Sequence, residues 1–134
     1  MNQRLSFSEP VIIRRVFRVM VASIFVVAGL GHVLRPETMT AKLVAAPVGA
    51  WIASVLPADP LMVASGVVLV VAGVVFAVGG RGARTAAWVL LVLLVPITIS
   101  THLGKGPDGV GPLFKNVAIA GALLHFVFAR PRDS

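Results

Sequence analysis

The 134-residue sequence contains no cysteine and no tyrosine. Without cysteine the chain can form no disulfide, no thiolate metal site and no dithiol redox motif. Without tyrosine it can provide neither a tyrosyl radical nor a tyrosine general acid. Any redox chemistry in which this protein takes part must therefore pass electrons through a bound cofactor or a partner.

Charged residues are also scarce. They make up 13% of the chain, against about 25% in typical soluble domains, whereas hydrophobic residues make up 57%. The apolar residues form long runs of Val, Leu, Ala and Ile, which are typical of membrane-spanning helices. The composition therefore predicts an integral membrane protein with a single domain over residues 1–134.

The few charges are mostly positive, and the formal net charge is +7. In a soluble chain this balance would favour a nucleic-acid partner. No basic patch in this sequence is interleaved with stacking aromatic residues, however. Basic residues gather instead in short segments between apolar runs, where they resist translocation across a bilayer. We therefore predict contact with a lipid bilayer and no nucleic-acid partner.

Four apolar runs approach the ~20 residues that a membrane-spanning helix needs. They cover residues 16–34, 61–78, 85–102 and 113–129. Asp59 and Pro60 predict the start of the second run, as N-cap and first helical residue. Residues 104–112 predict a loop, because they are rich in glycine and proline. The predicted fold is all-α, a four-helix transmembrane bundle.

The connection between the first two runs contains further apolar sequence. Residues 37–46 are compatible with a short helix, and residues 47–56 are too short to cross a bilayer. A short interfacial or re-entrant helical segment fits this stretch, with Trp51 at headgroup depth.

Basic residues distinguish the two sides of the predicted bundle. One side holds eight of them: Arg4, Arg14, Arg15, Arg18, Arg81, Arg84, Arg130 and Arg132. The other side holds four: Arg35, Lys42, Lys105 and Lys115. By the positive-inside rule, this asymmetry predicts a multi-pass protein of the cell membrane with both termini in the cytoplasm.

Small residues form stripes that predict close helix packing. The stripe on the first run consists of Arg18, Ala22, Phe25, Gly29 and His32, and that on the second of Gly66, Val70, Gly73 and Ala77. On the fourth run Ala118, Ala122, His125 and Ala129 share one face. This pattern predicts that His125 is buried between helices. A contact between Arg18 and His125 would then be an inner polar pair with a structural role.

Four polar side chains are predicted at the outer ends of their helices: His32, His102, Lys115 and Asn116. A lysine or histidine beside an amide could hydrogen-bond the carbonyls of a quinone or bind a small anion. The two histidines could instead ligate haem, or His32 could simply contact interfacial water near its helix end. Haem is disfavoured because both ligands would lie near one face, and no acidic residue within the helices supports a metal site.

The polar residues past Pro96 allow two interpretations. Thr98, Ser100 and Thr101 could satisfy backbone carbonyls freed near the proline. They could equally line a polar recess at the outer face.

Two stretches resemble a known family. Arg18 followed by Ala28-Gly29-Leu30-Gly31-His32, then Leu34 and Pro36, resembles the first segment of the DoxX-like membrane family. The stretch from Leu113 to Gly121, which contains Lys115-Asn116, resembles the opening of that family's last helix.

This resemblance implies a four-helix membrane protein tied to a redox system. Such systems include a quinone-linked thiosulfate oxidoreductase subunit and thiol-stress membrane assemblies. The family's Lys-Asn pair carries over to Lys115 and Asn116, and its basic position in the first helix to His32. His102 and His125 have no counterpart in this resemblance.

We therefore interpret the chain as a membrane subunit of a quinone-linked redox system with a polar pocket at its outer face. It contains no self-contained catalytic motif, so it would be at most a subunit of a membrane oxidoreductase. The alternative is a non-catalytic assembly subunit. In that case its glycine and alanine stripes would dock it to other membrane subunits or to itself.

Overall fold

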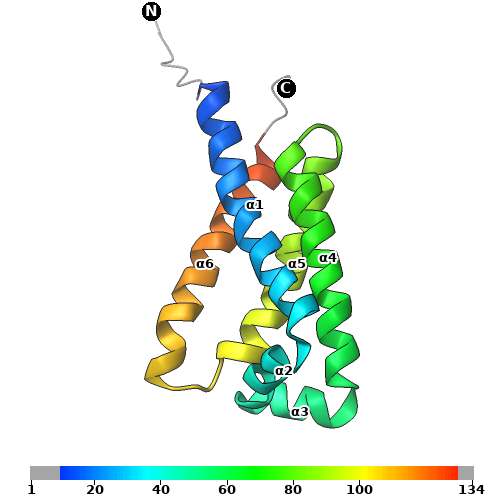
Figure 1. The fold of residues 1–134 in the computed structure, drawn as a ribbon. Helices are drawn as coiled ribbons and strands as arrows, with labels where there is room; N and C mark the ends of the chain where they lie inside the picture. The colour runs from blue at the N-terminus through cyan, green and yellow to red at the C-terminus, as the bar shows by residue number, and fades with distance from the viewer. Residues whose placement is uncertain (1–9, 130–134) are drawn as a thin grey trace, which may run out of the picture.

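The computed structural model describes residues 10–129, and this part of the chain folds into α-helices joined by short connections (Figure 1). The helices are α1 (Val11–Leu34), α2 (Pro36–Val44), α3 (Pro47–Val55), α4 (Ala58–Val78), α5 (Gly82–His102) and α6 (Pro107–Phe128). The predicted all-α bundle is confirmed. The stretch between the first two long helices, predicted to be interfacial or re-entrant, forms two short helices.

The four long helices form a bundle in which α1 packs on α4, α4 on α5 and α5 on α6. α1 and α6 meet through Phe17 and Phe126, whose ring centroids are 5.4 Å apart. Figure 1 shows α2 and α3 across one end of the bundle, here called the α2–α3 end. α1 begins and α6 ends at the opposite end, here called the terminal end.

By length and composition, α4, α5 and α6 can each cross a membrane. α2 and α3 together are apolar enough to count as one span, but they are bent by 118°, as in a broken span or a re-entrant loop. The predicted span 16–34 lies within α1, whose first eight residues include Arg14, Arg15 and Arg18. That α1 crosses the bilayer stays a prediction. The long helices expose many large apolar side chains, as a lipid-facing surface requires.

The hydrophobic core lies in the half of the bundle nearer the terminal end. Its largest fully buried side chains are Phe76, Leu90, Leu123 and Val127. Phe76 also packs edge-on against Phe126, with ring centroids 5.0 Å apart. Such aromatic contacts add about 0.5–1.5 kcal/mol to the burial itself. This half of the molecule is thus well packed, whereas the buried polar side chains Ser100 and Asn116 lie toward the α2–α3 end.

The packing stripes on α1 and α4 are confirmed. Ala22, Phe25 and Gly29 of α1 are buried, and so are Gly66 and Gly73 of α4. At the two ends of the α1 stripe, Arg18 and His32 are partly buried. Both ionisable residues therefore face the bundle, where a polar group in a membrane protein is least costly.

The predicted start of the second long helix, with Pro60 as its first residue, is wrong by two residues. α4 begins at Ala58, so Asp59 is not the N-cap. Its Oδ1 instead accepts a hydrogen bond from the Thr40 hydroxyl at 2.6 Å, which ties α2 to α4. Pro60 is tolerated as the third helical residue because first-turn N–H groups have no partner within the helix.

The predicted loop 104–112 is wrong beyond residue 106, because α6 begins at Pro107. Pro107 suits the first helical position, and Pro112 removes only the bond to the Asp108 carbonyl. The glycines have a packing role here. A Cβ on Gly109 would lie 2.5 Å from the carbonyl oxygen of His102. Close contact between α5 and α6, rather than a loop, accounts for glycine at this position.

Candidate functional site

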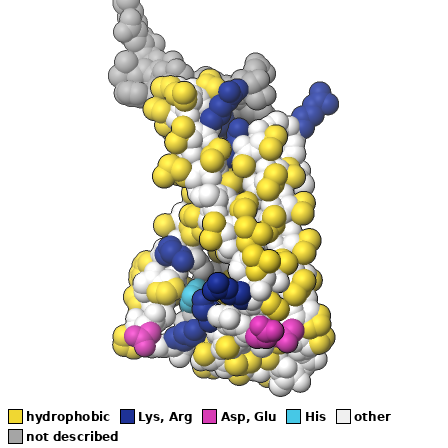
Figure 2. Space-filling view, viewed as in Figure 1, with side chains coloured by type: hydrophobic (Ala, Val, Ile, Leu, Met, Phe, Trp, Pro, Cys, Tyr) yellow, Lys and Arg dark blue, Asp and Glu magenta, His cyan; other side chains and the backbone are white. Residues whose placement is uncertain are grey.

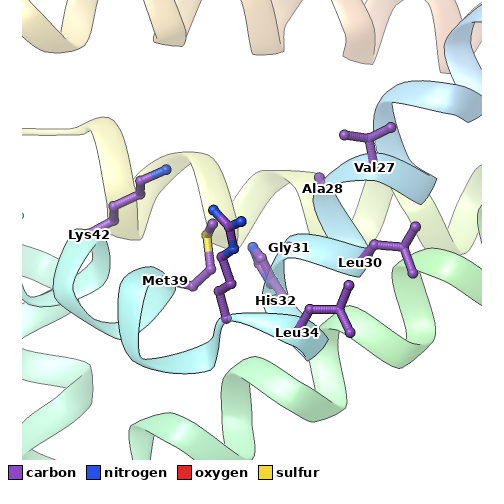
Figure 3. Close-up of a pocket in the computed structure, with 9 residues that line it drawn as sticks. Val27, Ala28, Leu30, Gly31, His32, Leu34, Met39 and Lys42 are labelled. Atoms are coloured by element: carbon purple, nitrogen blue, oxygen red, sulfur yellow. The ribbon is translucent and has the colours of Figure 1, made fainter.

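A pocket of about 530 Å³ that is open to the surface, here called the cavity, lies where α1 passes into α2. Its walls come from the last two turns of α1 and from α2: Val27, Ala28, Leu30, Gly31, His32, Leu34, Arg35, Met39 and Lys42 (Figure 3). Ligand sites in proteins commonly measure about 300–1,000 Å³. The cavity is therefore large enough for a small organic ring with part of a tail.

Two glycines determine where His32 lies. α1 and α4 cross at Gly29 and Gly66, and a Cβ on either residue would lie 2.7 Å from the other's carbonyl oxygen. Only glycine permits so close a backbone approach. This crossing brings the next turn of α1 against Ser65, so that His32 Nδ1 and Ser65 Oγ are 3.0 Å apart. The ring is thus held by a hydrogen bond from the neighbouring helix.

The chemistry of the cavity wall is mixed. Val27, Leu30 and Leu34 provide an apolar surface, while Arg35 and Lys42 provide two positive charges. Figure 3 shows the ring of His32 turned toward the space that Met39 and Lys42 also face. Such a wall suits an amphiphile whose polar oxygens meet the cations and whose ring and tail meet the aliphatic side chains.

The other predicted site residues, here called the α5–α6 group, lie on α5 and α6. Asn116 is 7% exposed, and its Nδ2 donates to Thr98 Oγ1 at 2.9 Å. His102 is partly buried and experiences the positive charges of Lys105 and Lys115, while the Lys115 side chain is exposed. This group lies at the α2–α3 end, like His32, but none of its members lines the cavity.

The hydroxyls after Pro96 do not compensate for the proline. Pro96 frees the carbonyl of Val92, whereas Thr98 donates to the Leu94 carbonyl and Thr101 to the Ile97 carbonyl, both at 2.6 Å. Thr98 also accepts the bond from Asn116. The hydroxyls therefore bond within their own helix and, at Thr98, attach α6.

Figure 2 shows these features on the surface. Dark blue side chains and a histidine gather around a hollow toward the α2–α3 end. The basic residues at this end are Arg35, Lys42, Lys105 and Lys115, from α1–α2 and from α5–α6. Among residues 10–129 no cluster of three or more His, Asp or Glu side chains could hold a metal ion.

The structure does not show the predicted inner pair. Arg18 Nε donates to the Ala77 carbonyl at 3.4 Å. His125, predicted to be buried, is exposed on α6 with its ring against Phe126. The buried face of α6 is formed by larger residues, including Ile119 and Leu123. In a lipid environment small residues can face outward, so the stripe of alanines predicted the wrong face.

Three residues of the site were missed from the sequence. In the sequence, Arg35 and Lys42 indicate topology alone, and no pattern distinguishes Ser65. Ser65 directly precedes Gly66, a member of the predicted packing stripe. A hydroxyl beside a packing glycine, opposite a histidine on the partner helix, was the available signal.

The comparison with protein families agrees with this architecture. The model of the DoxX family matches residues 14–103, which include most of α1, all of α2–α5 and every residue of the cavity. The match ends before α6, so Lys115 and Asn116 lie outside it. No curated protein and no solved structure matches the chain. The family match covers well over half of the sequence, and the chain belongs to the DoxX family of membrane proteins.

Proposed function

We propose that this protein is a membrane subunit of a quinone-linked redox system and that its cavity binds the quinone ring. The observation that carries this proposal is the histidine at the cavity wall, fixed by Ser65 between an aliphatic surface and two cations. We place the α2–α3 end at the outer face of the cell membrane, with both termini in the cytoplasm.

The cavity offers complementary groups for both parts of such a ligand. A quinone has an apolar ring and tail with two oxygens on opposite sides of the ring. Leu30 and Leu34 would contact the apolar part, and His32, Arg35 and Lys42 lie within the same wall to meet the oxygens. Buried polar groups need partners, and an oxygen between imidazole and guanidinium would have them.

Family membership supports a redox role, because the resemblance described above implies redox-linked membrane assemblies. The chain lacks cysteine and has no catalytic motif of its own. We propose that the electrons come from or go to another subunit, and that this protein supplies the membrane site. His102, Lys115 and Asn116 would provide a second polar surface at the same end.

The glycine stripes give the assembly alternative less support than the sequence suggested. Gly29, Gly66 and Gly73 would have docked the chain to other proteins, but a Cβ on any of them would meet atoms of α1 or α4 within 3 Å. These glycines are therefore used within the chain. Their presence no longer argues for a separate partner.

A binding measurement on purified protein in lipid nanodiscs tests the proposal. We expect wild type to bind a short-tail quinone, in its oxidised or reduced form, in equilibrium dialysis. We expect His32→Leu to weaken the binding of whichever form wild type binds more tightly at least about tenfold, because a lost hydrogen bond leaves a ligand oxygen unpaired. His125→Leu is the matched control, since His125 is exposed on α6, and it should bind like wild type.

Two outcomes would contradict the proposal. One is that wild type binds neither form of the quinone. The other is that His32→Leu and His125→Leu bind with the same affinity.

A further inference from the structure

Ser65 limits the ways in which its hydroxyl can interact with His32. A serine hydroxyl has one proton to donate. In this structure Ser65 Oγ donates to the Met62 carbonyl at 2.9 Å, within α4. The same oxygen lies 3.0 Å from His32 Nδ1. With its proton directed at Met62, Ser65 must accept the hydrogen bond from His32.

This constraint assigns the tautomer of His32. If Nδ1 is the donor, it carries the hydrogen, and a neutral imidazole has only one N–H. Nε2 then presents a lone pair. Arg35 and Lys42 already line the same cavity, and a protonated imidazole would add a third positive charge there at an electrostatic cost. The neutral ring is favoured, with an acceptor at Nε2.

We propose that the cavity prefers the reduced, hydroquinone form of its ligand, because His32 Nε2 accepts a hydrogen bond from a phenolic hydroxyl. This inference rests on the proposed function and adds which oxidation state binds. A quinone carbonyl only accepts hydrogen bonds, so it would place its lone pairs against that of Nε2. A hydroquinone O–H donates to Nε2, and its oxygens can still accept from Arg35 and Lys42.

Ser65 is thus a positioning residue, since it acts on the ligand only through the tautomer and orientation of His32. Ser65 therefore affects the ratio of the affinities for the hydroquinone and the quinone. Two facing lone pairs make no hydrogen bond, whereas the hydroquinone makes one at the same atom, and a tenfold change in affinity corresponds to about 1.4 kcal/mol. We expect about a tenfold preference for the hydroquinone.

The experiment compares the affinities of a short-tail hydroquinone and the corresponding quinone for the full chain in nanodiscs, without oxygen. In wild type we expect the hydroquinone to bind about ten times more tightly. In Ser65→Ala we expect a ratio near one, because either tautomer of His32 becomes accessible. Ser65→Thr keeps the hydroxyl and should restore the preference. A purely structural role for Ser65 would weaken both forms equally.

A second readout does not depend on a ligand. Nitrogen-15 NMR of the histidine rings should show His32 with its hydrogen on Nδ1 in wild type and in Ser65→Thr, but not fixed there in Ser65→Ala. His32 carrying its hydrogen on Nε2 in wild type would overturn the inference. Equal affinity for the two forms, or a higher affinity for the quinone, would also overturn the inference. In either case the proposed function would stand. If neither form binds, both fail.

Discussion

Arg18 illustrates how one charged side chain is accommodated inside the bundle. Its guanidinium lies over Gly79, where a Cβ would be 2.5 Å from one terminal nitrogen, and its Nε bonds the Ala77 carbonyl. Gly79 ends α4 with φ +88°, a conformation that glycine adopts without strain. The end of α4 therefore provides a carbonyl partner for the arginine, and the missing side chain of Gly79 leaves space for its guanidinium.

Replacing Gly79 should test whether the Arg18 guanidinium needs the space above it. Gly79→Ala should lower the free energy of unfolding by about 1–3 kcal/mol through backbone strain, and further because its methyl group displaces the guanidinium. Gly80→Ala is the matched control, since Gly80 also has positive φ, at +74°, but open space around it. Unfolding in mixed micelles measures both variants. Equal losses of unfolding free energy in the two variants would show that Arg18 does not need the space over Gly79. So would a difference between the two variants that stays the same when Arg18→Ala is also present.

Site residues were predictable where a polar group interrupted an apolar pattern. Arg18 and His32 stood out for this reason, and their positions at the ends of the α1 stripe are confirmed. His125 stood out equally but is exposed. Apolar side chains face both lipid and core in a membrane protein, so hydrophobicity does not distinguish these two faces. Ser65 was missed because its role comes from a tertiary contact.

The crossing of α1 and α4 connects packing to the site. Gly29 and Gly66 allow two backbones to touch, and the same approach brings His32 to Ser65. A Cβ on Gly66 would also lie 2.7 Å from the Cβ of His32. Any substitution that separates these helices should therefore disturb the histidine before it disturbs the distant core around Phe76.

Gly66→Ala should separate the two helices. We expect a loss of about 1–3 kcal/mol in the free energy of unfolding from overpacking, together with weaker ligand binding because His32 moves from Ser65. Gly121→Ala on α6 is the matched control, since nothing lies within 4 Å of its Cβ position. Unfolding and equilibrium dialysis report the two effects. Wild-type behaviour of Gly66→Ala in both assays would show that the crossing tolerates a methyl group.

Helices were easier to predict than their ends. Apolar runs near bilayer length are a strong signal, and α4, α5 and α6 follow them. The glycines and prolines of residues 107–112 predicted a loop where the structure has the start of α6. Proline fits a first helical turn, and Gly109 allows close packing against His102. The break before Pro47 agrees with the predicted division between residues 37–46 and 47–56, whereas no sequence pattern predicts the 118° angle between α2 and α3.

The whole molecule has two chemically different ends. Arg14, Arg15, Arg81 and Arg84 lie at the terminal end, and the cavity and the polar α5–α6 group lie at the other. Arg4, Arg130 and Arg132, which also contributed to the predicted orientation, lie outside the described residues. If the positive-inside rule holds, the cavity faces away from the cytoplasm.

Cysteine labelling should establish this orientation. Because the chain has no cysteine, only the introduced cysteine of each variant can react. Ser54→Cys on α3 and Arg81→Cys in the α4–α5 turn both replace exposed side chains. On intact cells, a membrane-impermeant maleimide should label Ser54→Cys but not Arg81→Cys. Permeabilised cells should show both variants labelled. The reverse pattern on intact cells would place the cavity on the cytoplasmic side.

The location of the cavity along the chain has a consequence for biosynthesis. All of its lining residues lie between Val27 and Lys42, and the serine that orients His32 follows at residue 65. Chains emerge from the ribosome N-terminus first, and early segments can pair before later ones exist. Once α4 has entered the membrane it can pair with α1, while α5 and α6 are still being made. The site can therefore form before the bundle around it is complete.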